Sequence, residues 1–234
     1  MTRTLLSPTR TLTSGVLLAV LALGLTACGD DSSGSDSPSR DSSSAAPDTG
    51  SSTDRTELDP AAGVAYPEAA APGAPVVEVY SDFQCPICQR FAEAYLDSLR
   101  EAADAGKINL VLHQFSFLDR ASRNEYSSRS ANAAACVYAE GGSTAYLDYY
   151  EALFENQPAE GTAGPENDEL VDLAATVGVT GIDSCVTDGV YDDYVEDAAD
   201  AAQEAGVNGT PTVVVDGEVV DQTKLDSAIN ALTA

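Results

Sequence analysis

The spacing of apolar residues predicts a mixed α/β domain after about residue 70. Residues 74–81 (APVVEVYS) and 107–117 (KINLVLHQFSF) are short runs rich in β-branched residues, which is typical of buried strands. Residues 86–106 lie between them and predict an amphipathic helix that ends at Gly106. Its apolar side chains are four residues apart, at Ile87, Phe91, Tyr95 and Leu99. Two strands joined by a helix form a βαβ unit, which is normally parallel and right-handed.

A block of helical patterns follows before the chain returns to strands. The predicted helices cover 127–142, 143–158, 168–179 and 190–207, with a short helix or turn at 181–189. Their aromatic residues are expected to pack in the core. Residues 210–220 then predict a β-hairpin with Asp216-Gly217 as its two-residue turn, and a last helix covers 223–234. The chain therefore predicts split βαβ and ββα halves with a helical insertion at about 120–207.

The first 27 residues have the pattern of a secretory signal. Arg3 and Arg10 precede an apolar run at 15–25, which is shorter than the ~20 residues that a spanning helix needs. The run ends at Leu-Thr-Ala-Cys, which resembles a bacterial lipobox and predicts lipidation of Cys28. The alternatives are an uncleaved membrane anchor, or ordinary cleavage that leaves Cys28 as an odd thiol.

Residues 28–69 predict a disordered tether that follows the lipidated cysteine. They are rich in Ser, Asp, Gly and Pro and have too few large apolar side chains to offset the entropy of ordering. Residues 70–234 are long enough for one domain with its own core. The whole chain carries a net charge of −27, which argues against a nucleic-acid partner and indicates a solvated acidic surface.

The cysteine count suggests disulfide chemistry. There are five cysteines, and setting Cys28 aside leaves four in an exported protein, which allow three pairings. Two of them, Cys85 and Cys88, are separated by Pro86 and Ile87 at the start of a predicted helix. Backbone N–H groups and the helix dipole at that end would stabilise a thiolate on Cys85 and lower its pKa. Cys88, one turn deeper, suits the role of resolving thiol.

Two other uses of the Cys-x-x-Cys motif are less well supported. A structural zinc site usually needs a second such pair or two histidines, and the chain has one histidine, His113. A purely structural Cys85–Cys88 bridge would close so short a loop that it would constrain the unfolded chain very little. No metal or organic cofactor is therefore expected.

Two segments together carry a resemblance to a known family. VEVYSDFQCPICQRF (77–91), followed by GVNGTPTVVVDG (206–217), is similar to the DsbA-like branch of the thioredoxin superfamily. More narrowly, it is similar to the membrane-tethered, extracytoplasmic thiol–disulfide oxidoreductases of Gram-positive bacteria. The resemblance implies an α/β thioredoxin fold with an inserted helical subdomain.

The resemblance also implies roles for other residues. It implies a cis peptide bond between Thr210 and Pro211, which would present the backbone of Thr210 to an extended substrate; otherwise Pro211 would be an ordinary strand-start proline. It implies a second disulfide between Cys136 and Cys185, with two buried free thiols as the alternative.

The chain departs from the family pattern at one position. Thioredoxin relatives often have a buried acid six residues before the first cysteine, where this chain has Val79. Glu78 is adjacent, but strand alternation points it to the opposite face, so Asp82 or water would have to serve. His113 lies in a strand and is interpreted as a structural or surface residue.

The predicted function is an extracytoplasmic, lipid-anchored protein thiol–disulfide oxidoreductase. Its Cys85–Cys88 disulfide would oxidise the thiols of exported proteins, and a quinone-linked membrane protein of the DsbB or VKOR type would reoxidise it. The alternatives are a reductase or isomerase of the same fold, and a non-catalytic binding lipoprotein.

Overall fold

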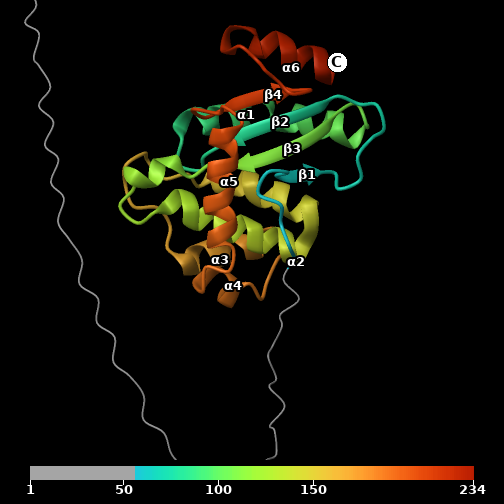
Figure 1. Cartoon of the computed structure of the whole chain (residues 1–234). Helices are drawn as coiled ribbons and strands as arrows, with labels where there is room; N and C mark the ends of the chain where they lie inside the picture. The colour runs from blue at the N-terminus through green and yellow to red at the C-terminus, as the bar shows by residue number, and fades with distance from the viewer. Residues whose placement is uncertain (1–55) are drawn as a thin grey trace, which may run out of the picture. The chain divides into compact units, whose positions relative to one another are not determined.

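A five-stranded mixed sheet forms the centre of the molecule in the computed structural model, which describes residues 56–234 (Figure 1). The strand order is β1-β3-β2-β4-β5, with β2 and β3 parallel and every other neighbouring pair antiparallel. The strands are β1 (Val64–Tyr66), β2 (Val76–Ser81), β3 (Asn109–Gln114), β4 (Thr212–Val215) and β5 (Glu218–Val219). The predicted α/β thioredoxin fold is confirmed by this arrangement.

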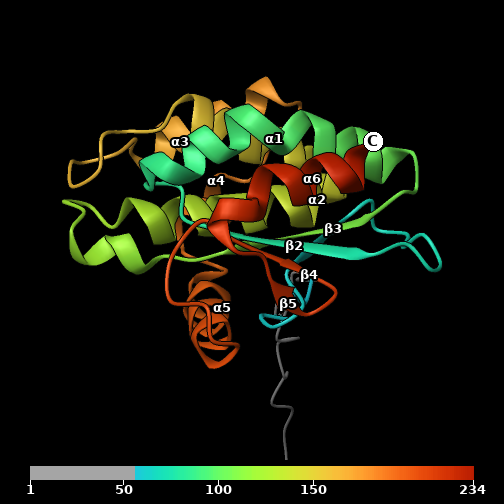
Figure 2. The same ribbon diagram turned by 90° about the horizontal axis from the view of Figure 1, so that it is seen from above.

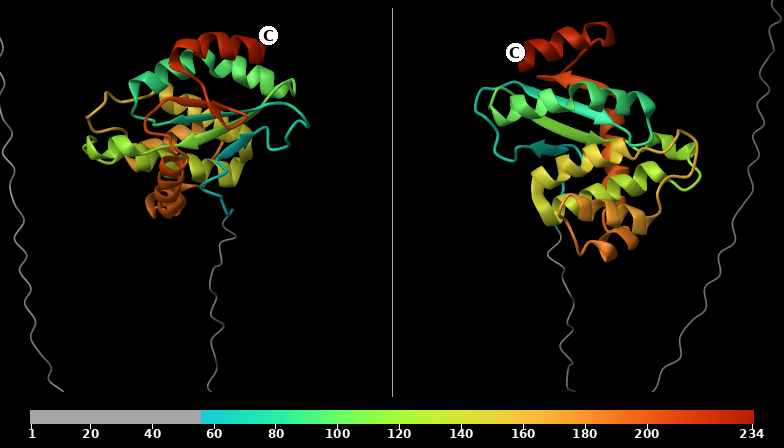
Figure 3. Two further views of the ribbon diagram at one scale, coloured as in Figure 1. Left: turned by 45° about the horizontal axis from the view of Figure 1, so that its top comes forward. Right: turned by 180° about the vertical axis from the view of Figure 1, so that it is seen from behind.

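Helices cover both faces of the sheet. Figure 2 shows α1 and α6 on one face and α5 on the other. Helices α2 to α5 lie between β3 and β4 in the sequence. Figure 3 shows that α3 and α4 pack against α2. The helices are α1 (Pro86–Asp104), α2 (Tyr126–Glu155), α3 (Asn167–Thr176), α4 (Asp183–Thr187), α5 (Asp192–Glu204) and α6 (Leu225–Thr233), with 3₁₀ turns η1 (Phe117–Arg120) and η2 (Gln222–Lys224).

Successive side chains of the central strands point to opposite faces of the sheet and pack in two separate cores. Val77 and Val79 of β2 join the main core under α1 and α2. Tyr80, on the opposite face, packs in a smaller cluster with Ala202 of α5 and with Val207. Because successive side chains of a strand point to opposite faces, one short strand anchors both helical layers. The aromatic residues of the second half of α2 are buried, as predicted; these are Tyr146, Tyr149, Tyr150 and Phe154.

The ordered domain begins earlier than the sequence predicted. The tether was expected to extend to residue 69, but β1 lies within that segment and pairs antiparallel with β3. Val64 and Tyr66 are buried while Ala65 between them is exposed. Three residues between Gly63 and Pro67 are too few to show strand periodicity, which explains why the sequence pattern missed this strand.

The two helices predicted on either side of a glycine pair meet end to end in α2. Gly142 has φ 72° and ψ −172°, values outside the helical region, so the axis is interrupted where the sequence predicted a stop. The backbone N–H of Ser143, at the start of the second half of α2, donates to the side chain of Glu68 at 3.1 Å. Glu68, which lies between β1 and β2, thus caps this half of the helix. Predictions that rest on residues 1–55, including the signal segment and lipidation of Cys28, lie outside the described residues.

A membrane-spanning segment is not present in the part of the chain that the structure describes. No helix among residues 56–234 is both long and apolar enough to cross a bilayer.

Candidate active site

The Cys-x-x-Cys motif lies where β2 passes into α1. Cys85 is the N-cap residue of α1, with extended backbone angles (φ −81°, ψ 116°), and Pro86 occupies the first helical turn. A proline is tolerated there because the first N–H groups of a helix have no intrahelical acceptor. The Cys85 carbonyl accepts the first helical hydrogen bond, from Gln89 at 3.1 Å. The local sequence thus fixes the first cysteine at the helix entrance, as predicted from the motif.

Cys85 is a free thiol in this structure, and its environment favours the thiolate. The Cys88 thiol donates a hydrogen bond to the Cys85 sulfur and, against the opposing effect of burial, lowers the pKa of Cys85 to about 6. The backbone N–H groups of Cys88 and Ile87 act in the same direction. The sequence predicted the direction of this shift from the backbone donors, but the neighbouring thiol is the larger cause.

Cys88 has the opposite character. Only 1% of its surface is exposed, and it is also a free thiol. Burial raises the pKa of Cys88 far above the usual value for a thiol, and the adjacent Cys85 adds to this rise. A negative charge between the two sulfurs therefore resides on Cys85 and the shared proton on Cys88.

Thr210 and Pro211 lie against the cysteine pair. The peptide bond between them is cis, as the family resemblance implied. Antiparallel pairing of β4 with β2 sets Tyr80 opposite Thr212, and this places the carbonyl oxygen of Thr210 3.6 Å from the Cys85 sulfur. The side chain of Gln222 donates to the Pro211 carbonyl at 3.0 Å and holds the segment from its other side.

An exposed apolar side chain adjoins these buried groups. Ile87, between the two cysteines, keeps 48% of its surface exposed. It is one of the few large apolar side chains that remain exposed in the described part of the chain, so the motif presents an apolar contact to any partner that reaches Cys85.

Glutamine side chains attach the helical insertion to the active-site loop. Gln157, just after α2, donates to the carbonyls of Phe83 and Cys85 at 2.9 and 3.1 Å. Gln84 donates in return to the carbonyl of Thr162 at 3.0 Å. The sequence analysis did not identify Gln157, because it lies 72 residues from Cys85 and no local pattern links the two.

The position six residues before Cys85 carries no acid. Val79 is buried in the main core, as expected from strand alternation. His113 is a structural residue: its ring stacks on Tyr80, with centroids 4.2 Å apart, and its Nε2 atom lies 3.1 Å from Glu78. Burial lowers the pKa of His113, against the effect of Glu78.

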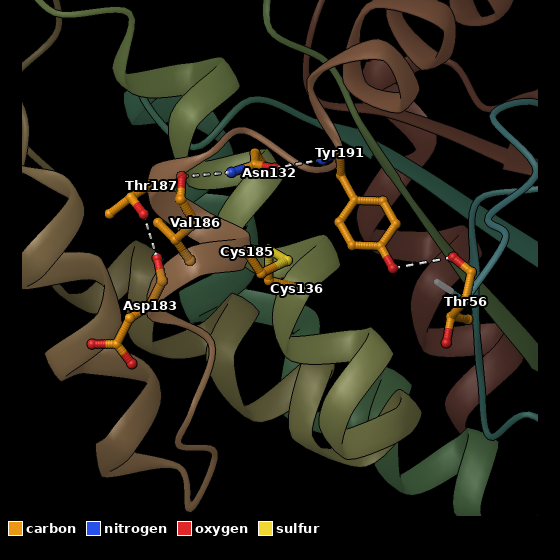
Figure 4. Close-up of a disulfide and its surroundings, with 8 residues drawn as sticks. All are labelled: Thr56, Asn132, Cys136, Asp183, Cys185, Val186, Thr187 and Tyr191. Atoms are coloured by element: carbon orange, nitrogen blue, oxygen red, sulfur yellow. Dashed lines mark hydrogen bonds between the residues drawn. A yellow bond between two sulfur atoms is a disulfide. The ribbon is translucent and has the colours of Figure 1, made fainter. Parts of the chain in front are cut away.

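A second pair of cysteines forms a disulfide within the helical insertion. Cys136 of α2 and Cys185 of α4 are joined with an S–S distance of 2.02 Å, the pairing that the resemblance implied (Figure 4). Beside the bridge, Asn132 donates to the carbonyl of Val186 and accepts from the backbone N–H of Tyr191. The bridge thus pins the short helix α4 to α2, and it is not part of the junction between β2 and α1.

Metal ligation has no evident site in residues 56–234. No group of three or more His, Cys, Asp or Glu side chains there is placed to hold a metal ion.

Comparisons with known proteins agree with this geometry. A family model described as "Thioredoxin" matches residues 68–232. The structure of oxidised DsbA from Mycobacterium tuberculosis is similar, with 32% sequence identity and a TM-score of 0.60 over 71% of this chain and 88% of that chain. The reduced form of a disulfide bond oxidoreductase, DsbG, from the same organism has 33% identity and a TM-score of 0.60, over 71% and 83% of the two chains.

A third solved structure extends the likeness in fold. MdbA, a thiol–disulfide oxidoreductase from Corynebacterium diphtheriae, has 22% identity and a TM-score of 0.62, over 70% of this chain and 86% of that chain. A comparison with curated protein sequences finds no match.

Proposed function

The chain belongs to the thioredoxin family, and we propose that it catalyses thiol–disulfide exchange by oxidising the thiols of exported proteins. The observation that carries this proposal is the opposite treatment of two thiols one helical turn apart. The pKa of Cys85 is lowered to about 6, while the pKa of Cys88 is raised by burial. This asymmetry suits Cys85 to exchange with a partner and Cys88 to take up the proton when the disulfide between them opens.

The reaction that we propose begins from the Cys85–Cys88 disulfide. A client thiolate attacks the Cys85 sulfur, the S–S bond breaks, and Cys88 leaves as a thiolate that takes up a proton. A second client thiolate then attacks the client sulfur of the mixed disulfide, and Cys85 leaves as a thiolate. The client loses two electrons and gains a disulfide, while the protein gains two electrons and ends with two reduced cysteines.

The direction of exchange follows from which redox form the protein stabilises. A thiolate held at a low pKa favours the reduced form, and a stabilised reduced form makes the disulfide a stronger oxidant. The lowered pKa of Cys85 therefore supports oxidation of clients. A reductase or isomerase of the same fold is the second candidate, because the same exchange chemistry runs in both directions.

The location and partners complete the proposal. We place the domain outside the cytoplasmic membrane, anchored by lipid on Cys28, with the segment that follows as its tether. The clients are exported proteins with free thiols, which meet exposed Ile87 beside Cys85. A quinone-linked membrane protein of the DsbB or VKOR type returns the cysteine pair to the disulfide.

Catalysed oxidation of a two-thiol peptide tests the proposed activity. The soluble domain is mixed with a reduced peptide and glutathione disulfide, and disulfide formation is followed by fluorescence. We expect Cys85→Ala to abolish catalysis. Cys88→Ala cannot form the starting disulfide, and we expect it to stop at a mixed disulfide between Cys85 and glutathione, which mass spectrometry detects. A double variant, Cys136→Ala with Cys185→Ala, serves as the control and should retain turnover. Equal rates with and without the wild-type protein would instead favour a non-catalytic binding lipoprotein.

A further inference from the structure

The turn that precedes the redox pair is built around one buried carboxylate, that of Asp82. The side chain has no exposed surface. Its Oδ1 atom accepts from the backbone N–H of Gln84 at 2.9 Å and from the hydroxyl of Ser127. Its Oδ2 atom accepts from the backbone N–H of Leu118 at 3.0 Å. One side chain therefore joins the active-site loop, η1 and the first turn of α2.

The main chain of the same residue contacts both cysteines. The carbonyl of Asp82 accepts from the backbone N–H of Cys85 at 2.9 Å, which closes a four-residue turn. The backbone N–H of Asp82 forms a hydrogen bond with the Cys88 sulfur. A side chain that accepts from the residue two positions on forms an Asx-turn, so the carboxylate and the backbone fix the same turn. The position of Cys85 at the helix entrance depends on this turn.

We propose that Asp82 is a positioning residue for the Cys85–Cys88 pair: its carboxylate holds the turn that ends at Cys85, and its negative charge opposes the thiolate there. The inference rests on the proposed function, since it concerns the same cysteines. Relatives often carry a buried acid six residues before the first cysteine, where this chain has Val79. Asp82 is a buried acid at a different position, and the proposal assigns it a role.

The electrostatic surroundings of Asp82 support a role in titration. Burial raises the pKa of Asp82 to about 6, against the hydrogen bonds from Ser127 and the two backbone N–H groups. The titratable groups that interact electrostatically with it are Asp119 of η1 and Tyr126 of α2, while Cys88 meets its backbone N–H. Arg129, the nearby cation on α2, is bonded to other groups, including the carbonyls of Asn124 and Pro165. The Asp82 charge therefore has no cationic partner among the hydrogen bonds that hold it.

The proposal sets the Asp82 charge one turn from the Cys85 thiolate, and it predicts that the two groups interact and titrate together. The pKa of Cys85 and that of Asp82 are both about 6. Interacting groups of this kind give broad, coupled transitions that belong to the pair and not to one residue. The thiolate of the reduced wild-type protein should therefore appear over a wider pH range than a single ionisation would give.

The test is a pH titration of thiolate absorbance at 240 nm in the reduced protein. Asp82→Asn keeps an oxygen that can accept from Gln84 and removes the charge. We expect it to narrow the transition and to move the Cys85 midpoint down by about one pH unit, because a like charge nearby disfavours the thiolate. At pH 7 this corresponds to an approximately tenfold shift of the equilibrium with glutathione, or about 30 mV. The control is Asp119→Asn, which removes a neighbouring carboxylate that contacts Ser127 and Ser128 but not the turn.

A second variant tests the positioning role. Asp82→Ala removes both the charge and the acceptor, and we expect its rate of peptide oxidation to fall at least about tenfold while Asp82→Asn stays within about threefold of wild type. If Asp82→Ala does not fold, the titration of Asp82→Asn decides alone. The proposal is overturned if the Asp82→Asn curve superimposes on the wild-type curve, or if Asp119→Asn shifts it equally.

These readouts also separate this inference from the proposed activity. The titration needs no client, so a protein that fails to oxidise the peptide can still show the Asp82 shift. In that case the proposed function falls and the effect of the Asp82 charge on Cys85 stands.

Discussion

The Sγ atom of Cys85 lies 3.6 Å from the carbonyl oxygen of Thr210, although 125 residues separate them in the chain. Pairing between β2 and β4 brings the two together, with Tyr80 opposite Thr212. In the proposed exchange, a client sulfur joined to Cys85 lies beside the Thr210–Pro211 segment. The reactive cysteine and this segment thus come from parts of the domain that are distant in the sequence.

The ionisation of Cys85 predicts the pH dependence of the reduced protein. Because the pKa of Cys85 is lowered to about 6, the rate of its alkylation by iodoacetamide should rise with pH, level off above about pH 7, and fall about tenfold for each unit below pH 5. The pKa of Cys88 is raised, so that thiol should stay unmodified through this range. Mass spectrometry of the alkylated protein locates the label, and Cys85→Ala is the control. A midpoint near the ordinary thiol value of 9.0 would contradict the prediction.

Removal of the second disulfide should affect stability more than activity. The Cys136–Cys185 bridge spans 49 residues, and the double alanine variant should lose about 4 kcal/mol of unfolding free energy in the chain-entropy model. Urea denaturation measures the loss, and the peptide oxidation rate at low denaturant is the companion measurement. Loss of activity in a variant that remains folded would mean that the bridge takes part in exchange.

Gln157 predicts a connection between the helical insertion and the active-site loop. Gln157→Ala removes two hydrogen bonds, to the carbonyls of Phe83 and Cys85, and should lower the unfolding free energy by about 1–2 kcal/mol. It should also slow peptide oxidation, because the loop that carries Cys85 loses its support. Gln203→Ala, on α5, is the matched control, since the side chain of Gln203 donates to the carbonyl of Ala199 in its own helix. Equal stability and rate in both variants would show that the contact has no role.

Much of the fold could be predicted from the sequence because its signals are local. Asp216-Gly217 predicted the hairpin turn, and both residues have positive φ in the structure, 49° and 82°. The position of the cysteine motif at the start of a helix could be predicted in the same way. The contributions of Asp82 and Gln157 were not, because each depends on partners distant in the chain, such as Ser127 and Phe83. Tertiary contacts of this kind leave no periodic pattern in the sequence.

Gly63 tests whether β1 is an integral part of the domain. A Cβ atom on Gly63 would lie 2.8 Å from the ring of His113 and 2.9 Å from the backbone oxygen of Leu112, and Gly63 has φ +63°. Gly63→Ala should therefore destabilise the protein by about 1–3 kcal/mol, as measured by urea denaturation. Gly73→Ala is the matched control, because Gly73 also has positive φ but no atom within 4 Å of its added Cβ. If the two variants lose the same amount, the close approach of Gly63 to His113 and Leu112 contributes nothing.

The reduction potential of the Cys85–Cys88 pair tests the proposed direction of exchange most directly. The soluble domain is equilibrated with glutathione buffers, and its oxidised fraction is measured by alkylation and mass spectrometry. The lowered pKa of Cys85 predicts a potential above the roughly −270 mV of thioredoxin, in the direction of the roughly −120 mV of strong disulfide oxidants. A potential near roughly −270 mV, typical of thioredoxin, would contradict the oxidase proposal and identify a reductase that depends on an electron donor.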